Sequence, residues 1–338
     1  MKKSKGFTLI ELWVVIAIIA VLMALCVSGC VVVDGDVQRV FTMGRKEAQR
    51  TEVLSHPLPD RRTLKIESSF GSIEVTGSAT TECRVEASVH ARAKSMDQAQ
   101  RILSQVKLQL DETATGLHLY WEKPAVGKGE SVGVSFVVLV PRHTDLDCLT
   151  SFGKIKINNI ANDVKAHTGF ASIRCTRIEG ALDLETKHGD IRCREILSTD
   201  VTLRSSFGNL ELKCLDLQPY QRPGYASLRT EHGTIVAENL AARQIEAHSS
   251  FGNIDIHCAP IEIESVKADL ETSYGSIDFD TPKRFAGKIH MTTSYGSVKT
   301  LFPVTVEGKA STTRLVGRIG EGRGDLRLHT SFGSIMLR

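Results

Sequence analysis

The sequence lacks several features that would give an early indication of function. Its 338 residues include eight cysteines but no CxxC pair, so no thiol spacing points to a zinc or redox site. Lysine and arginine are scattered and the net charge is only +3, which leaves no basic stripe for a nucleic-acid partner. Aromatic residues make up only 6% and prolines number 9, whereas glycines number 27. This composition favours many strands joined by tight turns.

Long hydrophobic runs are also missing, except at the N-terminus. There, three lysines precede an apolar run from Leu12 to Val27. This arrangement is typical of an export signal and predicts that the chain leaves the cytoplasm tethered to a membrane.

The start of this segment reads Gly6-Phe7-Thr8-Leu9-Ile10-Glu11-Leu12 and resembles the signal of type IV prepilins and pseudopilins. The resemblance implies cleavage after Gly6, methylation of Phe7, and contact of Glu11 with the amine of a neighbouring subunit. A carboxylate inside an apolar helix is costly, which indicates a functional partner for Glu11.

The end of the segment, Val27-Ser28-Gly29-Cys30, resembles a bacterial lipobox. That resemblance implies cleavage before Cys30 and attachment of lipid to its thiol. Ser28, Gly29 and the valines at 31–33 break helical character, whereas pilins continue their helix into the mature domain. Glu11 favours the prepilin hypothesis and the helix break favours the lipoprotein, so both stay open.

A short motif, an aromatic residue followed by glycine, any residue and an aliphatic residue, recurs through the rest of the chain. From Gly153 onward the glycine position returns every 16–25 residues, which is one turn of a solenoid. A degenerate copy is Val316-Gly317. The predicted corners are Phe70-Gly71, Phe152-Gly153, Phe170 (followed by Ala171), His188-Gly189, Phe207-Gly208, His232-Gly233, Phe251-Gly252, Tyr274-Gly275, Tyr295-Gly296 and Phe332-Gly333.

Each repeat unit reads as strand, turn, strand, with apolar residues alternating on both sides of the turn. Cys175 and Cys193 fall on equivalent inward positions, as small buried hydrophobic residues would. Stacked coils about 4.8 Å apart would share one core and align the aromatic residues in a ladder that faces inward. If the surface instead binds a sugar or a protein, the candidates are Phe251, Tyr274 and Tyr295.

Residues 80–148 interrupt the period. They predict a strand at 81–92, a short helix capped by Ser95, a hairpin around 113–116, and a strand ending at Pro141. This insertion is expected to cap the N-terminal end of the solenoid. The expected organisation is all-β, a parallel β-solenoid behind an N-terminal hydrophobic helix: a signal or anchor segment at 1–30, a linker at 31–58, and a solenoid at 59–338 with regular coils at 149–338.

The order of a first coil, an insertion and SFGxI repeats is similar to the DUF4097-type domain, whose members are candidate adhesins. The resemblance covers roughly residues 60–338 and rests on the repeats. It implies a β-solenoid in bacterial envelope proteins, often lipoproteins, and so favours Cys30 as the processing site.

Residues that could support catalysis are few. Asp278 and Asp280 share a strand face, as do Glu262 and Glu264, but acids on an outward face are usually solvated. His188 and His232 lie two coils, or about 9–10 Å, apart, too far to share a zinc ion with bonds of about 2.0–2.1 Å. The sequence therefore predicts no catalytic, cofactor or metal site.

The expected function is a non-enzymatic, adhesin-like module anchored in the cell envelope, facing the periplasm or cell surface. It would attach to the membrane through its N-terminal helix or lipid and bind a protein or polysaccharide, or act as a scaffold. One alternative is a minor pilin-like subunit that assembles through its N-terminal helix. Another is a carbohydrate-active β-helix enzyme.

Overall fold

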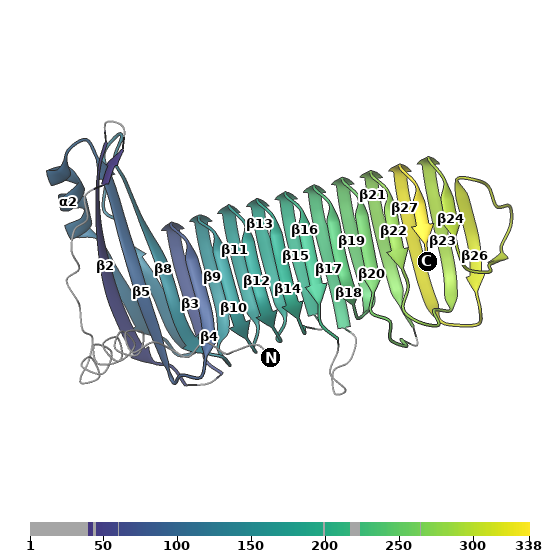
Figure 1. The fold of residues 1–338 in the computed structure, drawn as a ribbon, viewed down its shortest axis with the longest axis horizontal. Coiled ribbons are helices and arrows are strands. Elements are labelled where there is room, and N and C mark those ends of the chain that lie inside the picture. Colours follow the sequence, from purple (N-terminus) through teal and green to yellow (C-terminus); the bar gives the residue numbers. More distant parts are fainter. Residues whose placement is uncertain (1–39, 43–44, 60, 199, 217–223, 264) are drawn as a thin grey trace, which may run out of the picture.

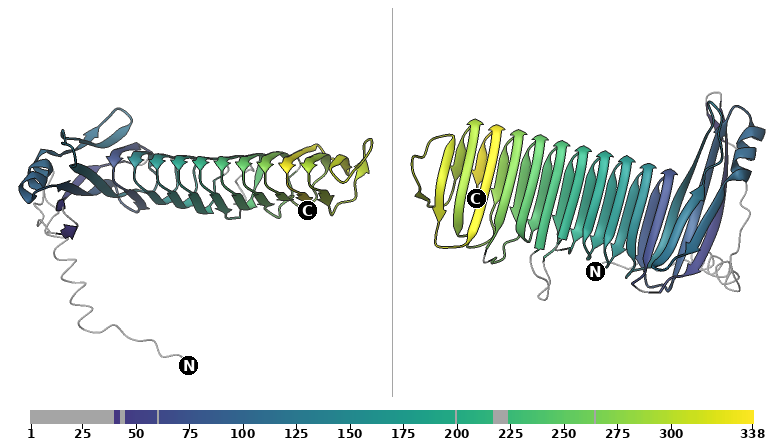
Figure 2. Two further views of the ribbon diagram at one scale, coloured as in Figure 1. Left: turned by 90° about the horizontal axis from the view of Figure 1, so that it is seen from above. Right: turned by 180° about the vertical axis from the view of Figure 1, so that it is seen from behind.

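The computed structural model describes residues 40–42, 45–59, 61–198, 200–216, 224–263 and 265–338. Two 14-stranded sheets face each other along the length of an elongated body. Most neighbouring strands are parallel. Each regular coil contributes one strand to each sheet, so the chain changes sheet from one strand to the next (Figures 1 and 2). The predicted all-β parallel solenoid is confirmed.

The first sheet, called sheet A, follows one spatial order from end to end. It contains β1 (Val40–Thr42), β2 (Arg45–Pro57), β5 (Glu82–Ala93), β8 (Ser131–Pro141), β4 (Ile73–Ser78), β10 (Ile155–Ile160), β12 (Ile173–Ile178), β14 (Ile191–Ile196), β16 (Leu210–Cys214), β18 (Ile235–Leu240), β20 (Ile254–Cys258), β22 (Ile277–Asp280), β28 (Ile335–Leu337) and β24 (Val298–Thr300).

The second sheet, sheet B, runs alongside in the same direction. It contains β6 (Lys107–Glu112), β7 (Gly116–Glu122), β3 (Thr63–Phe70), β9 (Asp145–Phe152), β11 (Val164–Phe170), β13 (Leu182–His188), β15 (Asp200–Phe207), β17 (Gly224–His232), β19 (Ala242–Phe251), β21 (Lys267–Tyr274), β27 (Gly324–Phe332), β23 (Gly287–Tyr295), β26 (Arg314–Ile319) and β25 (Thr305–Val306).

The core lies between the sheets and is built from the inward residue of each alternating pair. In β12 and β14, Ile173 pairs with Ile191 and Cys175 with Cys193, and all four side chains are buried. No coil could bury its apolar face alone, but stacking makes the faces continuous. The inward positions predicted for the two cysteines are confirmed.

The spatial order of the coils departs from chain order at both ends. The coil β3–β4 lies between β7–β8 on one side and β9–β10 on the other. At the other end, the final coil β27–β28 lies between β21–β22 and β23–β24. The corner at Phe332, the last in the sequence, therefore does not end the stack, since the repeat motif specifies a coil but not its neighbours.

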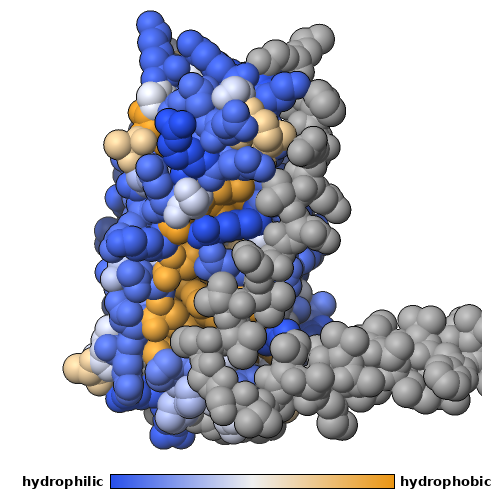
Figure 3. Space-filling view, turned by 90° about the vertical axis from the view of Figure 1, so that its left-hand side faces the viewer, coloured by the Kyte–Doolittle hydropathy of each residue, from blue (hydrophilic) through white to orange (hydrophobic). Residues whose placement is uncertain are grey.

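The insertion lies at the N-terminal end of the two sheets, where its strands and helix form a cap. β2, β5 and β8 pair antiparallel, and helix α2 (Met96–Gln105) contacts β2 and β5. The Ser95 hydroxyl accepts a hydrogen bond from the amide of Gln98, which caps the helix. Seen from this end, the surface is polar around an apolar strip (Figure 3).

Residues 45–57, expected within a linker with some strand, form β2 and pair with β5 along its whole length, with Ala48 buried in the core. The degenerate motif at Val316-Gly317 is not a corner. It lies in β26, which pairs antiparallel with β23 beyond the last coil.

Residues 217–223 and the whole segment 1–39 lie outside the described residues. Within the part of the chain that is described, no helix is both long and apolar enough to cross a membrane.

Candidate functional site

The aromatic residues that end the strands of sheet B form one stack along an edge of the solenoid. Ring centroids of neighbours lie 4.7–5.0 Å apart and their planes differ by at most 8°. We call this stack the aromatic ridge. In spatial order it consists of Phe70, Phe152, Phe170, His188, Phe207, His232, Phe251, Tyr274, Phe332 and Tyr295.

A buried serine or threonine hydroxyl lies two residues before each ring and links its coil to the adjacent one. Each hydroxyl donates to a backbone carbonyl of the adjacent coil, at 2.8–3.4 Å. In eight coils the acceptor is the corner glycine; Ser68 uses Val134 and Thr186 uses Ala171. The hydroxyls belong to Ser68, Thr150, Thr168, Thr186, Ser205, Thr230, Ser249, Thr272, Thr330 and Thr293. Sequence reasoning missed this column, although serine or threonine occupies that position in every copy.

Close stacking favours glycine at the corners, although Ala171 occupies this position in one coil. A Cβ built on Gly208 would lie 2.0 Å from the carbonyl oxygen of Gly189, and one on Gly153 only 1.8 Å from that of Gly71. A side chain there would push neighbouring coils apart. The predicted corner residues therefore form two parallel columns, of rings and of glycines, and the hydroxyls form a third beside them.

The rings face outward, so the expectation of an inward ladder is wrong. Their exposed fractions run from 39% for Phe70 to 69% for Tyr295. The chain turns at each glycine, which directs the preceding side chain away from the core. Both faces of each inner ring are covered by its neighbours, and only the ring edges meet solvent.

The two histidines of the ridge take the place of phenylalanine. His188 stacks between Phe170 and Phe207, and His232 between Phe207 and Phe251. Among the described residues, no group of three histidine, cysteine or acidic side chains could hold a metal ion.

The ends of the ridge differ. At the N-terminal end, the Lys123 ammonium lies 4.7 Å from the centroid of the Phe70 ring, a cation–π contact that covers its outer face. At the other end, Tyr295 is the most exposed ring.

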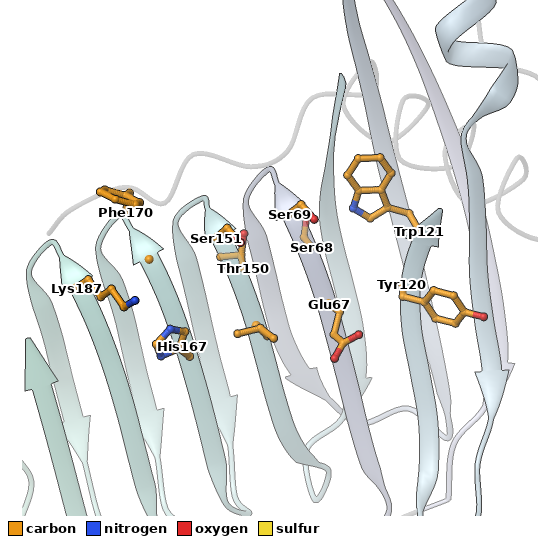
Figure 4. A pocket seen from close by; sticks show the side chains of 12 residues that line it. Glu67, Ser68, Ser69, Tyr120, Trp121, Thr150, Ser151, His167, Phe170 and Lys187 are labelled. Atoms are coloured by element: carbon orange, nitrogen blue, oxygen red, sulfur yellow. The ribbon is translucent and has the colours of Figure 1, made fainter. Parts of the chain in front are cut away.

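A shallow hollow of about 510 Å³ lies beside the ridge on sheet B, over the strands from β7 to β13 (Figure 4). Its lining includes Trp121, Leu149, Phe170 and Glu67. The Lys65 ammonium, 2.7 Å from Glu67, donates a hydrogen bond that lowers the pKa of this carboxyl and keeps it charged. The walls of the hollow mix apolar, hydroxyl and charged side chains.

The candidate carboxylates of sheet A are engaged in ion pairs. The Arg338 guanidinium lies 2.7 Å from Asp278 and 3.4 Å from Asp280. His257 lies 2.6 Å from Asp280, and this hydrogen bond raises the pKa of the imidazole. Burial raises the pKa of Asp278, against the opposing effect of Arg338. Glu262 pairs with Arg284 at 3.0 Å, and Glu264 lies outside the described residues.

The six cysteines of the body carry free thiols in this structure. All but Cys214 are buried, and burial raises the pKa of the Cys83 thiol to about 12. Such thiols are unreactive, which fits small core residues. The N-terminal candidates Gly6, Phe7, Glu11 and Cys30 lie outside the described residues.

Stacked coils of two parallel sheets with an external aromatic ridge define a repetitive β-solenoid. The chain belongs to the Toastrack DUF4097 family, which matches residues 61–338. The predicted family is confirmed. In addition, residues 1–27 match the prokaryotic N-terminal methylation motif.

Two solved structures resemble the chain at low sequence identity. One is a candidate adhesin from Bacteroides fragilis NCTC 9343, with 15% identity and a TM-score of 0.41, covering 85% of this chain and 97% of that one. The other is a candidate cell adhesion protein from Clostridium sporogenes ATCC 15579, with 8% identity and a TM-score of 0.22, covering 85% and 98%. No curated protein matches the chain.

Proposed function

We propose that this chain is a non-enzymatic module, tethered to the cell envelope by its N-terminal segment, that binds a partner through the aromatic ridge. The observation that carries the proposal is the ridge itself, a continuous row of exposed ring edges on a rigid frame. Stacking between coils uses only the faces of the rings and does not explain why their edges are exposed. Exposed apolar edges in an unbroken row are typical of an interaction surface.

The geometry favours a protein over a polysaccharide as the partner. A sugar binds an aromatic residue by lying flat on its face, but the inner faces of the ridge are occupied by neighbouring rings. This argues against the expectation that Phe251 and Tyr274 stack on sugars. Ring edges can still pack against apolar side chains.

The match to the methylation motif supports the prepilin hypothesis for the anchor, with Gly6, Phe7 and Glu11 in their predicted roles. It also supports the alternative of a pilin-like subunit that assembles through this segment. Lipidation of Cys30 is the competing proposal. Mass spectrometry of the mature N-terminal peptide separates them, because a methylated Phe7 retains the helix whereas an acylated Cys30 removes it.

The state of the candidate acids supports a non-enzymatic role. Asp278 and Asp280 are held by Arg338, and neither lines the hollow beside the ridge. A carboxylate pair for sugar hydrolysis needs one acid free to give a proton.

The binding proposal can be tested in intact cells with a photo-cross-linking amino acid. We place it at Phe251 on the ridge or, as a control, at Val236, which faces outward on sheet A. Adducts from position 251 but not from position 236 would support a ridge partner. Equal yields from both positions, or no adduct from 251, would contradict it.

A further inference from the structure

The aromatic ridge exposes more apolar surface than a solitary soluble domain usually does. Its eight phenylalanine and tyrosine side chains are 39–69% exposed. With about 150–250 Å² for each aromatic side chain, they leave on the order of 600–1,000 Å² open. The largest apolar patch on a typical monomer is about 300–600 Å², and a stable interface buries about 800 Å² per partner. The ridge alone is therefore large enough for a specific interface.

The spacing of the ridge restricts what can cover it. A partner that contacts every rung must present apolar groups at intervals of 4.7–5.0 Å along a straight line. The ridge of a second copy of this chain has the same ring spacing. When one ring of each copy is aligned, all the overlapping rings are therefore aligned as well. Symmetric self-association through one patch is also the commonest form of assembly.

The residues beside the ridge allow close approach. In the column directly before the rings, eight of the ten residues are serine or glycine, and only Lys187 and Glu231 are charged. Those eight are Ser69, Ser151, Gly169, Ser206, Ser250, Ser273, Ser331 and Ser294. Small side chains leave the ring edges as the most prominent groups on this edge of the solenoid.

The cap determines how two copies can meet. At the N-terminal end, β5, β8 and helix α2 rise above the line of the ridge (Figures 1 and 4). Two parallel copies would bring cap against cap and hold the ridges apart. Two antiparallel copies avoid this, because each cap then lies beyond the C-terminal end of the other ridge.

From these observations we infer that the chain forms an antiparallel homodimer in which the aromatic ridges of two copies pack against each other. The inference rests on the proposed function, since it names the partner of the same surface. The contact is dry in the middle and bordered by the serine columns.

The test uses the full-length chain purified from membranes in a mild detergent, with its mass measured by sedimentation equilibrium. The ridge variant carries Ser151→Glu, Ser206→Glu and Ser331→Glu. With the ten rungs of two antiparallel copies fully overlapped, position 151 faces position 331 and position 206 faces Glu231, so like charges meet beside the rings. The control carries Thr76→Glu, Asn158→Glu and Thr176→Glu, which lie in register on the outer face of sheet A. Circular dichroism and melting temperature verify that both variants fold.

The wild-type chain and the control should be dimers. In the ridge variant, the dimer dissociation constant should rise by about 100-fold or more, because like charges facing each other cost several kcal/mol. A monomeric wild-type chain would overturn the inference. So would a ridge variant that dimerises as well as the control, because the contact would then lie elsewhere, for example in the N-terminal segment.

The cross-linking experiment at Phe251 separates this inference from the function on which it rests. An adduct with twice the mass of the chain supports both. An adduct with a different macromolecule, together with a monomeric purified chain, overturns the homodimer but leaves the binding function. A monomeric chain without any ridge adduct contradicts both.

Discussion

The middle and the two ends of this solenoid follow different rules. From β9 to β22, each coil lies beside its neighbours in the chain, and the three columns of hydroxyl, ring and glycine repeat with little change. At each end the coil nearest the terminus is placed one position inside the stack, and antiparallel strands complete the edge. Local repetition thus fixes the shape of a coil, whereas the ends depend on contacts between distant parts of the chain.

The sharpest test of this difference removes one coil from each region. Truncation after Gly322 removes β27 and β28 and leaves β21 and β23 without the strand between them. We expect β21 and the strands after it to become sensitive to protease. The truncation should lower the free energy of unfolding by more than about 4 kcal/mol, which is more than single substitutions usually cost. Limited proteolysis followed by mass spectrometry measures it.

The matched control deletes residues 171–188, which joins Phe170 directly to Gly189 and preserves the corner motif. This removes a middle coil but lets the next coil take its place, so only one coil's share of stability is lost. If the two deletions were equally damaging, the distinction between the middle and the ends would fail.

A second prediction concerns close stacking in the middle. Gly208→Ala places a methyl group where the carbonyl of Gly189 stands, 2.0 Å away, and should destabilise the protein by about 3 kcal/mol or more. Gly127→Ala is the control, because the nearest atom there belongs to the flexible Glu130 side chain at 3.2 Å. The two midpoints of urea denaturation give the comparison, and equal midpoints would contradict the stacking argument.

A third prediction concerns the hydroxyl column. Thr230→Val removes the hydrogen bond to Gly208 and leaves the carbonyl without this buried donor, which costs about 1–3 kcal/mol. Thr230→Ser keeps the hydroxyl, as Ser205 and Ser249 do in adjacent coils, and should cost less than the valine variant. If denaturation curves show the serine variant to be less stable than the valine variant, the hydroxyl column does not stabilise the stack in this way.

The smallest expected effect is a pH dependence of stability that comes from His257, near the displaced final coil. The hydrogen bond with Asp280 raises the pKa of His257, so the folded protein holds this proton more strongly than the unfolded chain. The resulting stability is complete below the unfolded pKa of about 6.5 and is lost as pH rises through the higher folded value. Because the His257 side chain is 39% exposed, we expect less than about 1 kcal/mol.

Melting temperatures across pH 6–8 measure this loss, with His257→Gln as the comparison. The glutamine variant should show a flatter pH dependence than the wild type. If the two profiles fall in parallel, the stabilising protonation belongs to another group.

Much of the middle was predictable from sequence, because its rules are local. The corner motif specified strand, turn and strand, and alternation placed Cys175 and Cys193 inside. The outward direction of the rings was not predictable from alternation. Thr230 and His232 are two residues apart, so alternation would place both side chains on the same face. Thr230 is nevertheless buried and His232 exposed, because the chain already turns toward Gly233 at His232.

The arrangement of the ends could not be predicted from the motif. Phe332 carries the same motif as Tyr274 and Tyr295, and nothing in the motif says that it lies between them. That position follows from β26, which pairs antiparallel with the free edge of β23 and so leaves only the opposite edge for β27. The polar composition of residues 45–57 predicted only a linker with some strand, because few apolar residues of β2 reach the core: Ala48 is buried and Leu54 packs against the core.

The displaced final coil has a consequence for the order in which the protein can form. A chain that is made from its N-terminus can add coils one at a time up to β22. The next segment, β23 to β26, cannot join the stack, because its parallel neighbour β27 has not yet emerged. The coil β23–β24 and its antiparallel neighbour β26 can therefore take their places only after β27 and β28 are available.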